Sequence, residues 1–297
     1  MNQDNFFNLL GPLTNKCDLK PKVLESLDCG EYIQEKIEYS VEPQERIKAY
    51  ILLPKKRKPK TPAVYCHHQH SSNYNRAKSE IIGLKGDPDL AYAKELAENG
   101  FITFAPDAIA FEDRNWHSES WWGVEYFELA TRLVKGETLL GKVLSDVSVG
   151  IDYLMTRHEV DGENIGFIGH SYGGRMAIWS PVFDERIKVS VSNCYCINYK
   201  NSLLKSSGTR IPMELCVPGI LKYGDIEDIV KLIEPCSLYI SVAEDDKWSR
   251  DAKEIYDYAK NSFVKGELKL KIWPGGHGFS KEMRKEAYSF LNNHLCA

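Results

Sequence analysis

One short run of residues, Gly169-His170-Ser171-Tyr172-Gly173-Gly174, constrains the fold of this chain more than any other. It follows the apolar run Ile165 to Ile168 and precedes a segment with helical spacing, so it joins a strand to a helix by a sharp turn. Such a turn strains its central residue, and glycines two positions to either side remove side chains that would clash there. The pattern predicts a G-x-S-x-G nucleophile elbow with Ser171 at its tip.

The residues around the elbow support this interpretation over a structural serine in a tight turn. Asp161-Gly162 precedes the strand as a turn signal, and Arg175-Met176-Ala177-Ile178-Trp179 continues at helical spacing. The N-terminus of that helix supplies free N–H groups and a favourable dipole where negative charge would develop.

Short β-type runs alternate with helical segments along most of the chain, which predicts an α/β fold with a mostly parallel central sheet and helices on both faces. Before this pattern, Glu31 to Val41 and Arg46 to Leu53 alternate in polarity and predict an N-terminal antiparallel hairpin. The later strands are expected at Ala63 to His67, Phe101 to Phe104, Ile165 to Ile168, Ile187 to Ser192, Leu238 to Ala243 and Leu268 to Ile272. The helices are expected at Leu90 to Asn99, Glu137 to Arg157, Tyr172 to Val182, Ser249 to Ser262 and Lys281 to Leu295.

The domain organisation is predicted as a single α/β domain over residues 1–297, with residues 1–30 as an irregular or helical lead-in. Two segments, residues 108–136 and 198–235, do not fit the alternation of strands and helices. Both follow strands. Since ligands bind outside the carboxyl ends of the strands in open α/β sheets, we expect these segments to form pocket walls or a partial cap.

The charge of the chain argues against a polyanionic partner. The 38 basic and 42 acidic side chains give a formal net charge of −4, so nucleic acid is not an expected ligand. The one basic cluster, Lys55 to Lys60, contains a proline and is interpreted as a solvated turn between two strands. The expected partner is a small-molecule ester, and a homo-oligomer is compatible with the sequence.

Neither membrane insertion nor secretion is expected. The N-terminus lacks a positively charged region followed by an apolar stretch, and no run approaches the roughly 18 apolar residues that span a bilayer. The predicted location is therefore the cytoplasm, without a membrane partner. The eight cysteines contain no C-x-x-C pair, so free thiols are expected rather than a metal cage.

A serine hydroxyl needs a histidine base and a carboxylate that orients the base. In this type of fold both follow the serine along the chain, each after a later strand. His277 lies in the glycine-rich segment Trp273 to Phe279, between the last expected strand and the last helix, so it is the candidate base. The acid is expected in Ala243-Glu244-Asp245-Asp246; Asp246 is preferred from its spacing after Ala243, and Asp245 is the alternative.

The oxyanion of an acyl-transfer intermediate needs two N–H donors. One is expected from the backbone of Tyr172, directly after the nucleophile. The second is expected from the loop after the strand Ala63 to Cys66, where Gln69 and His70 both qualify and Gln69 is our candidate. His68 and His70 could point to one side and suggest a metal, but no carboxylate or cysteine stands at ligand spacing, so no metal or other cofactor is expected.

Candidate substrate-binding residues come from the loops around the expected pocket. Tryptophan-rich walls suit a partly apolar ligand, although the same side chains can pack under a loop as a satellite core. The candidates are His68, His70, Arg114, Trp116, Trp121, Trp122 and Trp248.

With Ser171, Asp246 and His277 in this order, the chain resembles the α/β-hydrolase superfamily, and more narrowly its dienelactone hydrolase and acetyl xylan esterase-related branch. Dienelactone hydrolase itself has a cysteine nucleophile, so the serine here argues against dienelactone cleavage. The lack of a visible secretion signal argues against an extracellular polysaccharide esterase. The branch resemblance rests on His68-Gln69-His70, Lys78-Ser79-Glu80, Gly83-Leu84-Lys85-Gly86, Ala105-Pro106-Asp107 and Pro218-Gly219-Ile220.

The function expected from these features is a serine hydrolase that cleaves carboxylic esters through an acyl-enzyme intermediate. The same three side chains also serve peptidases, amidases and thioesterases. An α/β-hydrolase fold that has lost catalysis and binds a ligand is a further alternative, because a fold does not by itself define a function.

Overall fold

A computed structural model describes residues 1–297 except 14–16, 72, 117–122, 202, 206–209 and 297. Its described strands form a nine-stranded sheet in the order β1-β2-β3-β5-β4-β6-β7-β8-β9. The pairs β1–β2, β2–β3 and β3–β5 are antiparallel. The remaining neighbours in this order, from β5–β4 to β8–β9, are parallel. The strands are β1 (Lys22–Asp28), β2 (Tyr32–Glu42), β3 (Glu45–Pro54), β4 (Thr61–His67), β5 (Ile102–Pro106), β6 (Val160–His170), β7 (Ile187–Asn193), β8 (Ser237–Ala243) and β9 (Leu268–Trp273).

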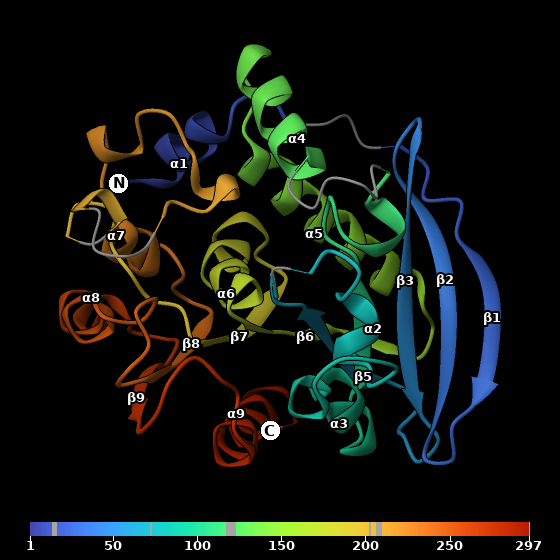
Figure 1. The fold of residues 1–297 in the computed structure, drawn as a ribbon. Coiled ribbons are helices and arrows are strands. Elements are labelled where there is room, and N and C mark those ends of the chain that lie inside the picture. The colour runs from blue at the N-terminus through green and yellow to red at the C-terminus, as the bar shows by residue number, and fades with distance from the viewer. Residues whose placement is uncertain (14–16, 72, 117–122, 202, 206–209, 297) are drawn as a thin grey trace.

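Helices cover both faces of this sheet, as Figure 1 shows. Helices α3 and α9 lie on one face, and α1, α5 and α6 lie on the other. Short 3-10 turns interrupt the long connections. The α-helices are α1 (Gln3–Leu10), α2 (Lys78–Ile81), α3 (Tyr92–Glu98), α4 (Gly123–Val134), α5 (Leu139–Thr156), α6 (Tyr172–Phe183), α7 (Ile226–Lys231), α8 (Ala252–Ala259) and α9 (Lys281–Leu295).

The two-sided burial follows from the period of a strand. Successive side chains point to opposite faces, so a strand covered on both faces is apolar throughout. In β6, Phe167 belongs to the core beneath α5 and α6, and Ile168 belongs to the core beneath α3 and α9. The expected α/β fold with its antiparallel N-terminal hairpin, β2 and β3, is confirmed.

The lead-in segment differs from its prediction in one respect. Its helix α1 agrees with a helical lead-in, but β1 is a strand that the sequence pattern did not reveal. All seven residues of β1 are exposed, and the pairing with β2 is irregular between Val23 and Glu25. An edge strand with solvent on both faces has no reason to alternate apolar and polar residues, so the usual signal is absent.

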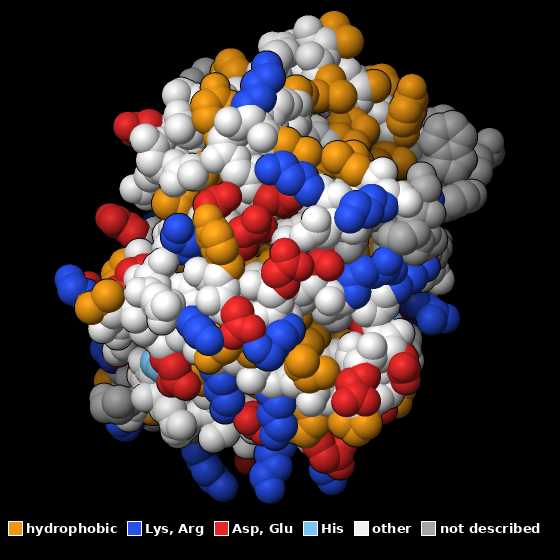
Figure 2. All heavy atoms as spheres, turned by 90° about the vertical axis from the view of Figure 1, so that its left-hand side faces the viewer, with side chains coloured by type: hydrophobic (Ala, Val, Ile, Leu, Met, Phe, Trp, Pro, Cys, Tyr) orange, Lys and Arg blue, Asp and Glu red, His pale blue; other side chains and the backbone are white. Residues whose placement is uncertain are grey.

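The surface of the described residues carries mixed charge on the face that Figure 2 shows. Lysine and arginine side chains alternate there with aspartate and glutamate, and hydrophobic side chains gather near the top. None of the helices in the described part of the chain has the length and apolar composition to cross a membrane.

Helix α1 is attached to the rest of the molecule by aromatic packing. Phe6 is fully buried and stacks on Trp179 of α6, with ring centroids 5.9 Å apart. We expect Phe6→Ala to lower the free energy of unfolding by about 3–5 kcal/mol, because it leaves a cavity beside Trp179. Urea denaturation measures the change, with Val264→Ala at an exposed position as the control. A Phe6→Ala protein as stable as the control would contradict this packing role.

Candidate active site

Ser171 lies at the sharp turn between β6 and α6. Its backbone has φ of 57° and ψ of −107°, a strained conformation for a residue with a side chain. The turn is held by a hydrogen bond from the Ser171 N–H to the carbonyl oxygen of Asn193 on β7, at 2.9 Å. A Cβ atom on Gly173 would lie 2.0 Å from the His67 carbonyl oxygen, so only glycine lets α6 approach β4 this closely.

His277 joins Ser171 to Asp246. Its Nε2 lies 2.9 Å from the Ser171 Oγ, and its Nδ1 lies 3.0 Å from the Asp246 Oδ1. With Nδ1 protonated and donating to the carboxylate, Nε2 is left to accept the serine proton. The structure therefore brings together the three side chains that we expected to act together, from the ends of β6, β8 and β9.

The carboxyl group beside His277 belongs to Asp246 and not to the alternative, Asp245. Asp246 is 3% exposed, whereas Asp245 is exposed and donates its backbone N–H to the Gly275 carbonyl oxygen. Burial by itself would raise the pKa of the Asp246 carboxyl. The hydrogen bond from His277, with further ones from Ser249 and Trp248, outweighs burial and places that pKa below its ordinary value.

The end of β7 holds the histidine loop, a role that the sequence pattern did not reveal. The Asn193 side chain donates to the Gly278 carbonyl oxygen at 3.0 Å and to the Nδ1 of His170 at 2.8 Å. The Cys194 thiol donates to the same carbonyl at 3.1 Å. Because the Asn193 carbonyl oxygen also accepts the Ser171 N–H, one residue holds both the turn at Ser171 and the loop that carries His277. The only sequence signal for it is its place at the carboxyl end of a central strand.

Cys194, Asp246 and His277 also place three metal-ligand atom types within 4.8 Å of one another. Burial raises the pKa of the Cys194 thiol to about 12, and the protonated thiol donates to the Gly278 carbonyl oxygen. The Asp246 and His277 atoms already bond to each other. The hydrogen bonds account for this cluster without a metal.

The loop after β4 is held rigidly beside the elbow. The Ala108 N–H donates to the Nε2 of His68 at 3.0 Å, and the Nδ1 of His68 donates to the Gln69 carbonyl oxygen at 2.7 Å. Burial lowers the pKa of His68 to about 4, so the ring is neutral. The Gln69 side chain donates to Glu80 of α2 at 2.9 Å. Tyr172, as the first residue of α6, has a backbone N–H without a partner inside the helix, as an oxyanion donor requires.

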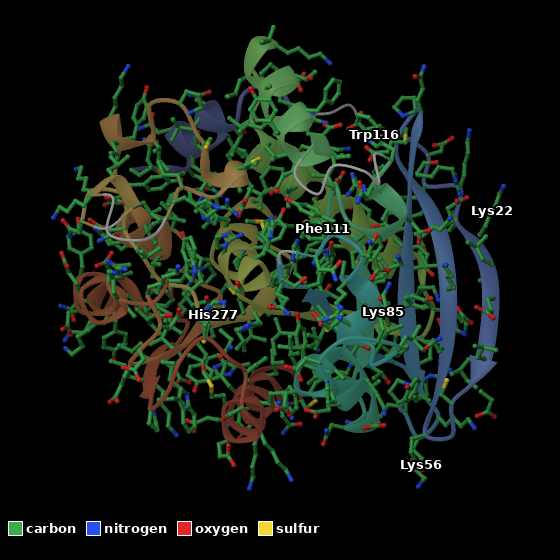
Figure 3. All side chains as sticks on the ribbon, viewed as in Figure 1. Lys22, Lys56, Lys85, Phe111, Trp116 and His277 are labelled. Carbon is green, nitrogen blue, oxygen red and sulfur yellow. The ribbon has the colours of Figure 1, made fainter. Side chains whose placement is uncertain are left out.

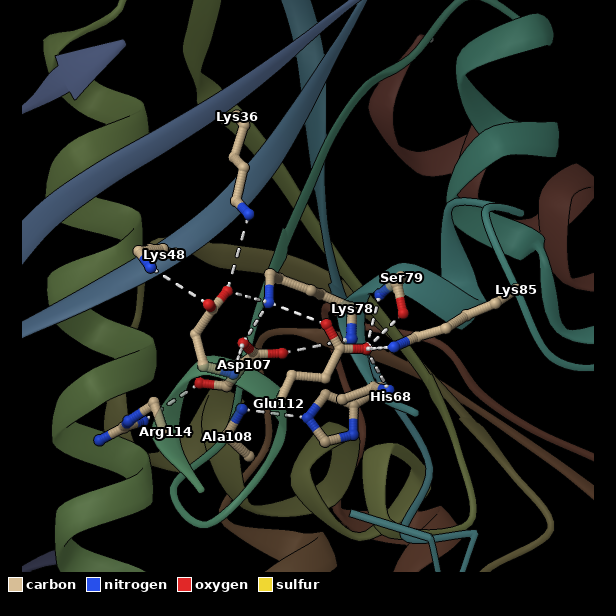
Figure 4. Close-up of polar contacts among 12 residues, drawn as sticks. Lys36, Lys48, His68, Lys78, Ser79, Lys85, Asp107, Ala108, Glu112 and Arg114 are labelled. Carbon is tan, nitrogen blue, oxygen red and sulfur yellow. Dashed lines mark hydrogen bonds and ion pairs between the residues drawn. The ribbon is translucent and has the colours of Figure 1, made fainter. Parts of the chain in front are cut away.

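A buried lysine fixes the segment behind this loop, as Figure 4 shows. The Lys78 ammonium, 2% exposed, pairs with Asp107 and lies 2.8 Å from both Glu112 and Asp113. Burial raises the pKa of Asp107 to about 7 against the opposing effect of Lys78. The next residue, Ala108, donates to His68, so the ion cluster supports the wall that carries Gln69.

The pocket at Ser171 has a volume of about 290 Å³. Residue Glu125 comes from the 108–136 segment and residues 210–214 come from the 198–235 segment, so both unusual segments contribute to its wall. Of the sequence candidates, Ser171, His277, Gln69, His70 and Trp248 line it. The complete lining is Gln69, His70, Ser71, Glu125, Ser171, Arg175, Arg210, Ile211, Pro212, Met213, Glu214, Trp248 and His277.

Several sequence candidates do not lie in this pocket. Arg114 is buried and pairs with Glu45 and Asp146, because its guanidinium ties the segment after β5 to β3 and α5. Trp116 is 60% exposed and packs edge-on against Phe127, far from His277 in Figure 3. His68 supports the wall from behind. Trp121 and Trp122 lie outside the described residues.

Charged residues of the pocket wall were missed. Arg175, Glu125 and Glu214 line the pocket, but ordinary charge counting treats such residues as solvent-exposed. A usable signal exists only for Arg175, which stands four residues after Ser171 and so lies on the same face of α6.

The chain is similar in sequence to known proteins. Residues 47–213 match the model of the Dienelactone hydrolase family. The chain is 31% identical over 230 residues to "Putative hydrolase YtaP" of Bacillus subtilis (strain 168), covering 77% of this chain and 75% of that protein.

Solved structures share the fold at low sequence identity. A glucuronoyl esterase from Solibacter usitatus has a TM-score of 0.71 and 14% identity, covering 98% of this chain and 91% of its own. An acetyl xylan esterase from Paenibacillus sp. R4 has a TM-score of 0.70 and 16% identity, covering 99% and 93% respectively. These similarities establish a common α/β-hydrolase architecture.

The buried Lys78 cluster makes a prediction about stability. We expect Lys78→Met to lower the free energy of unfolding at pH 7 by about 3–5 kcal/mol, because it removes the buried ammonium group that pairs with the carboxyl groups of Asp107 and Glu112. Burial already holds the pKa of Asp107 above its unfolded value, and without the lysine that pKa rises further, while the pKa of Glu112 loses the lowering effect of Lys78. The loss should therefore shrink as the pH falls from 7 toward 5 and the carboxyls take up protons.

Urea denaturation at the two pH values measures this effect. Lys94→Met is the matched control, since Lys94 is exposed and pairs only at 3.8 Å with Glu98. A Lys78→Met loss that does not depend on pH would show that the cluster is not held by charge.

Proposed function

The chain belongs to the dienelactone hydrolase family, and we propose that it is a serine esterase in which Ser171, His277 and Asp246 cleave carboxylic esters through an acyl-enzyme intermediate. The observation that carries this proposal is the continuous path of hydrogen bonds from the Ser171 Oγ through the imidazole to a buried carboxylate. Residues 1–297 would act as one catalytic domain, because the three side chains come from strands of one sheet.

The proposed reaction begins with attack of the Ser171 Oγ on the ester carbonyl carbon. The serine proton moves to the Nε2 of His277, and the Asp246 carboxylate stabilises the resulting imidazolium. The backbone N–H groups of Tyr172 and Gln69 would donate to the oxyanion that forms. The imidazolium then protonates the leaving alcohol, and a water molecule activated by the same histidine hydrolyses the acyl-enzyme.

The substrate class follows from the family and the size of the pocket. A volume of about 290 Å³ suits a small ester or the end of a larger one. The serine nucleophile favours ordinary esters over dienelactones, in keeping with the esterase names of the structural neighbours. Amide and thioester cleavage by the same triad are the alternatives, and a cytoplasmic location stays a prediction.

Covalent labelling tests whether Ser171 is an activated nucleophile. We expect a fluorophosphonate probe to modify the wild-type protein stoichiometrically, and peptide mass mapping to locate the adduct at Ser171. The Ser171→Ala protein should not react, whereas Ser289→Ala, at an exposed serine of α9, should label like the wild type. Folded wild-type protein that resists the probe would refute the esterase in favour of a non-catalytic ligand-binding protein.

The acid of the triad has a separate test. We expect Asp246→Asn to lower kcat for p-nitrophenyl acetate by about 10⁴-fold, because the amide no longer selects the productive histidine tautomer or stabilises the imidazolium. Asp245→Asn changes the adjacent exposed carboxyl and should leave kcat little changed. Equal losses in the two variants, measured by steady-state kinetics, would count against Asp246 as the orienting group.

A further inference from the structure

An apolar groove borders the catalytic pocket and plays no part in the proposed bond cleavage. It has a volume of about 610 Å³, and Lys222 is the one charged residue among the described residues that line it. Leu133 at the end of α4 is 38% exposed in this groove, and Leu204 is 54% exposed. A contiguous apolar surface of this kind belongs in soluble proteins to a ligand groove or an interaction site. The lining consists of Leu133, Tyr199, Leu204, Ile211 and residues 215–222.

Two elements lead from the catalytic pocket into this groove. Ile211 is only partly buried and lines both cavities. The chain continues from residues 210–214, which line the pocket, to residues 215–222, which line the groove. Helix α4 likewise contributes Glu125 to the pocket and Leu133, two helical turns later, to the groove. This step along the helix is about 12 Å, so the groove extends away from the cavity that contains the nucleophile.

The direction of the reaction decides which part of an ester points toward the groove. His277 protonates the leaving alcohol in the proposed reaction, so the alcohol part lies beside His277 and the acyl part lies on the other side of the ester carbonyl. His277 and Trp248 line the pocket but not the groove. In Figure 1, α4 and β9 lie on opposite sides of α6, and Figure 3 places His277 on the side of β9. The acyl part therefore points toward the groove.

The lining of the groove favours an unbranched apolar chain. A polar group would lose its hydration there and find few partners, whereas each methylene group gains free energy when it leaves water. A short acyl group ends within the catalytic pocket, which has a volume of about 290 Å³. Only a chain long enough to pass Ile211 can cover the exposed side chains of Leu133 and Leu204.

We propose that this groove binds the acyl chain of the substrate, so that the preferred substrate is an ester of an unbranched fatty acid rather than an acetate. The inference rests on the proposed function, because the ester carbonyl must lie at Ser171 while the chain extends past Ile211. The groove then determines specificity for chain length, and the triad performs the cleavage.

The dependence of activity on chain length tests the groove. We expect wild-type kcat/KM for p-nitrophenyl decanoate to exceed that for p-nitrophenyl butyrate by at least about tenfold, because each buried methylene group contributes roughly a threefold gain. Both esters are used below the concentrations at which they aggregate. An equal or lower value for the decanoate, in an enzyme that cleaves the butyrate, overturns the acyl groove and leaves the esterase in place.

The double variant Leu133→Gln/Leu204→Gln makes the groove polar at two exposed positions, where substitutions have little effect on folding. It should lower the decanoate-to-butyrate ratio of kcat/KM by at least about threefold, the contribution of one methylene group. Val134→Gln is the matched control, because Val134 adjoins Leu133, is 90% exposed and does not line the groove. The control should keep the wild-type ratio. An undiminished ratio in the folded double variant overturns the inference.

Two further measurements separate this inference from the proposed function and from another occupant of the groove. Calorimetry on Ser171→Ala measures binding of decanoate and butyrate without turnover. Tighter binding of decanoate, weakened by the two glutamine substitutions, supports the groove even where a catalytically silent wild type refutes the esterase. Light scattering measures the oligomeric state. A dimer that dissociates in the double variant, together with equal activity on both esters, assigns the groove to a second copy of the chain and overturns the acyl groove.

Discussion

The strained turn at Ser171 is the constraint on which the rest of the site depends. Its positive φ is maintained because the following helix is pressed onto β4 at Gly173 and because β7 accepts the Ser171 N–H. Both contacts require parallel strands on either side of β6, with their carboxyl ends level. The central sheet therefore sets the direction of the Ser171 side chain, and the loops after β8 and β9 bring the Asp246 carboxylate and the His277 imidazole to it.

Burial of charge is the second organising theme. Lys142 is fully buried and pairs with Glu42, Glu45 and Asp146, which ties the N-terminal hairpin to α5. Lys78 does the same for the loops beside the oxyanion side of the pocket. A buried charge without a partner would strongly destabilise the fold. The segments that meet at each cluster must therefore pack in the one arrangement that pairs its charges. Arg175 and Glu214 form a further buried ion pair, which joins α6 to the 198–235 segment.

Local patterns were sufficient to predict the central elements and the proximity of Ser171, Asp246 and His277. The elbow and β8 are signalled by apolar runs, and β9 by alternating apolar and polar residues. Each ends in polar or glycine-rich residues, and chain order then predicts which side chains follow. β1 was missed because neither face is buried, and Arg114 was misassigned because its buried partners, Glu45 and Asp146, are distant in sequence. The charged residues of the pocket wall, Arg175, Glu125 and Glu214, were not predicted. They become buried only when segments that are distant in sequence pack against each other.

Asn193 has a consequence for how such an enzyme can diversify. Its carbonyl oxygen fixes the elbow and its side chain fixes the histidine loop, yet the 198–235 segment that carries Glu214 begins only a few residues later. Ser171 and His277 are thus held by a residue that precedes this part of the pocket wall. An insertion between β7 and β8 can therefore change which ester is bound without moving Ser171 relative to His277. This connection is a suitable position for changes in substrate specificity.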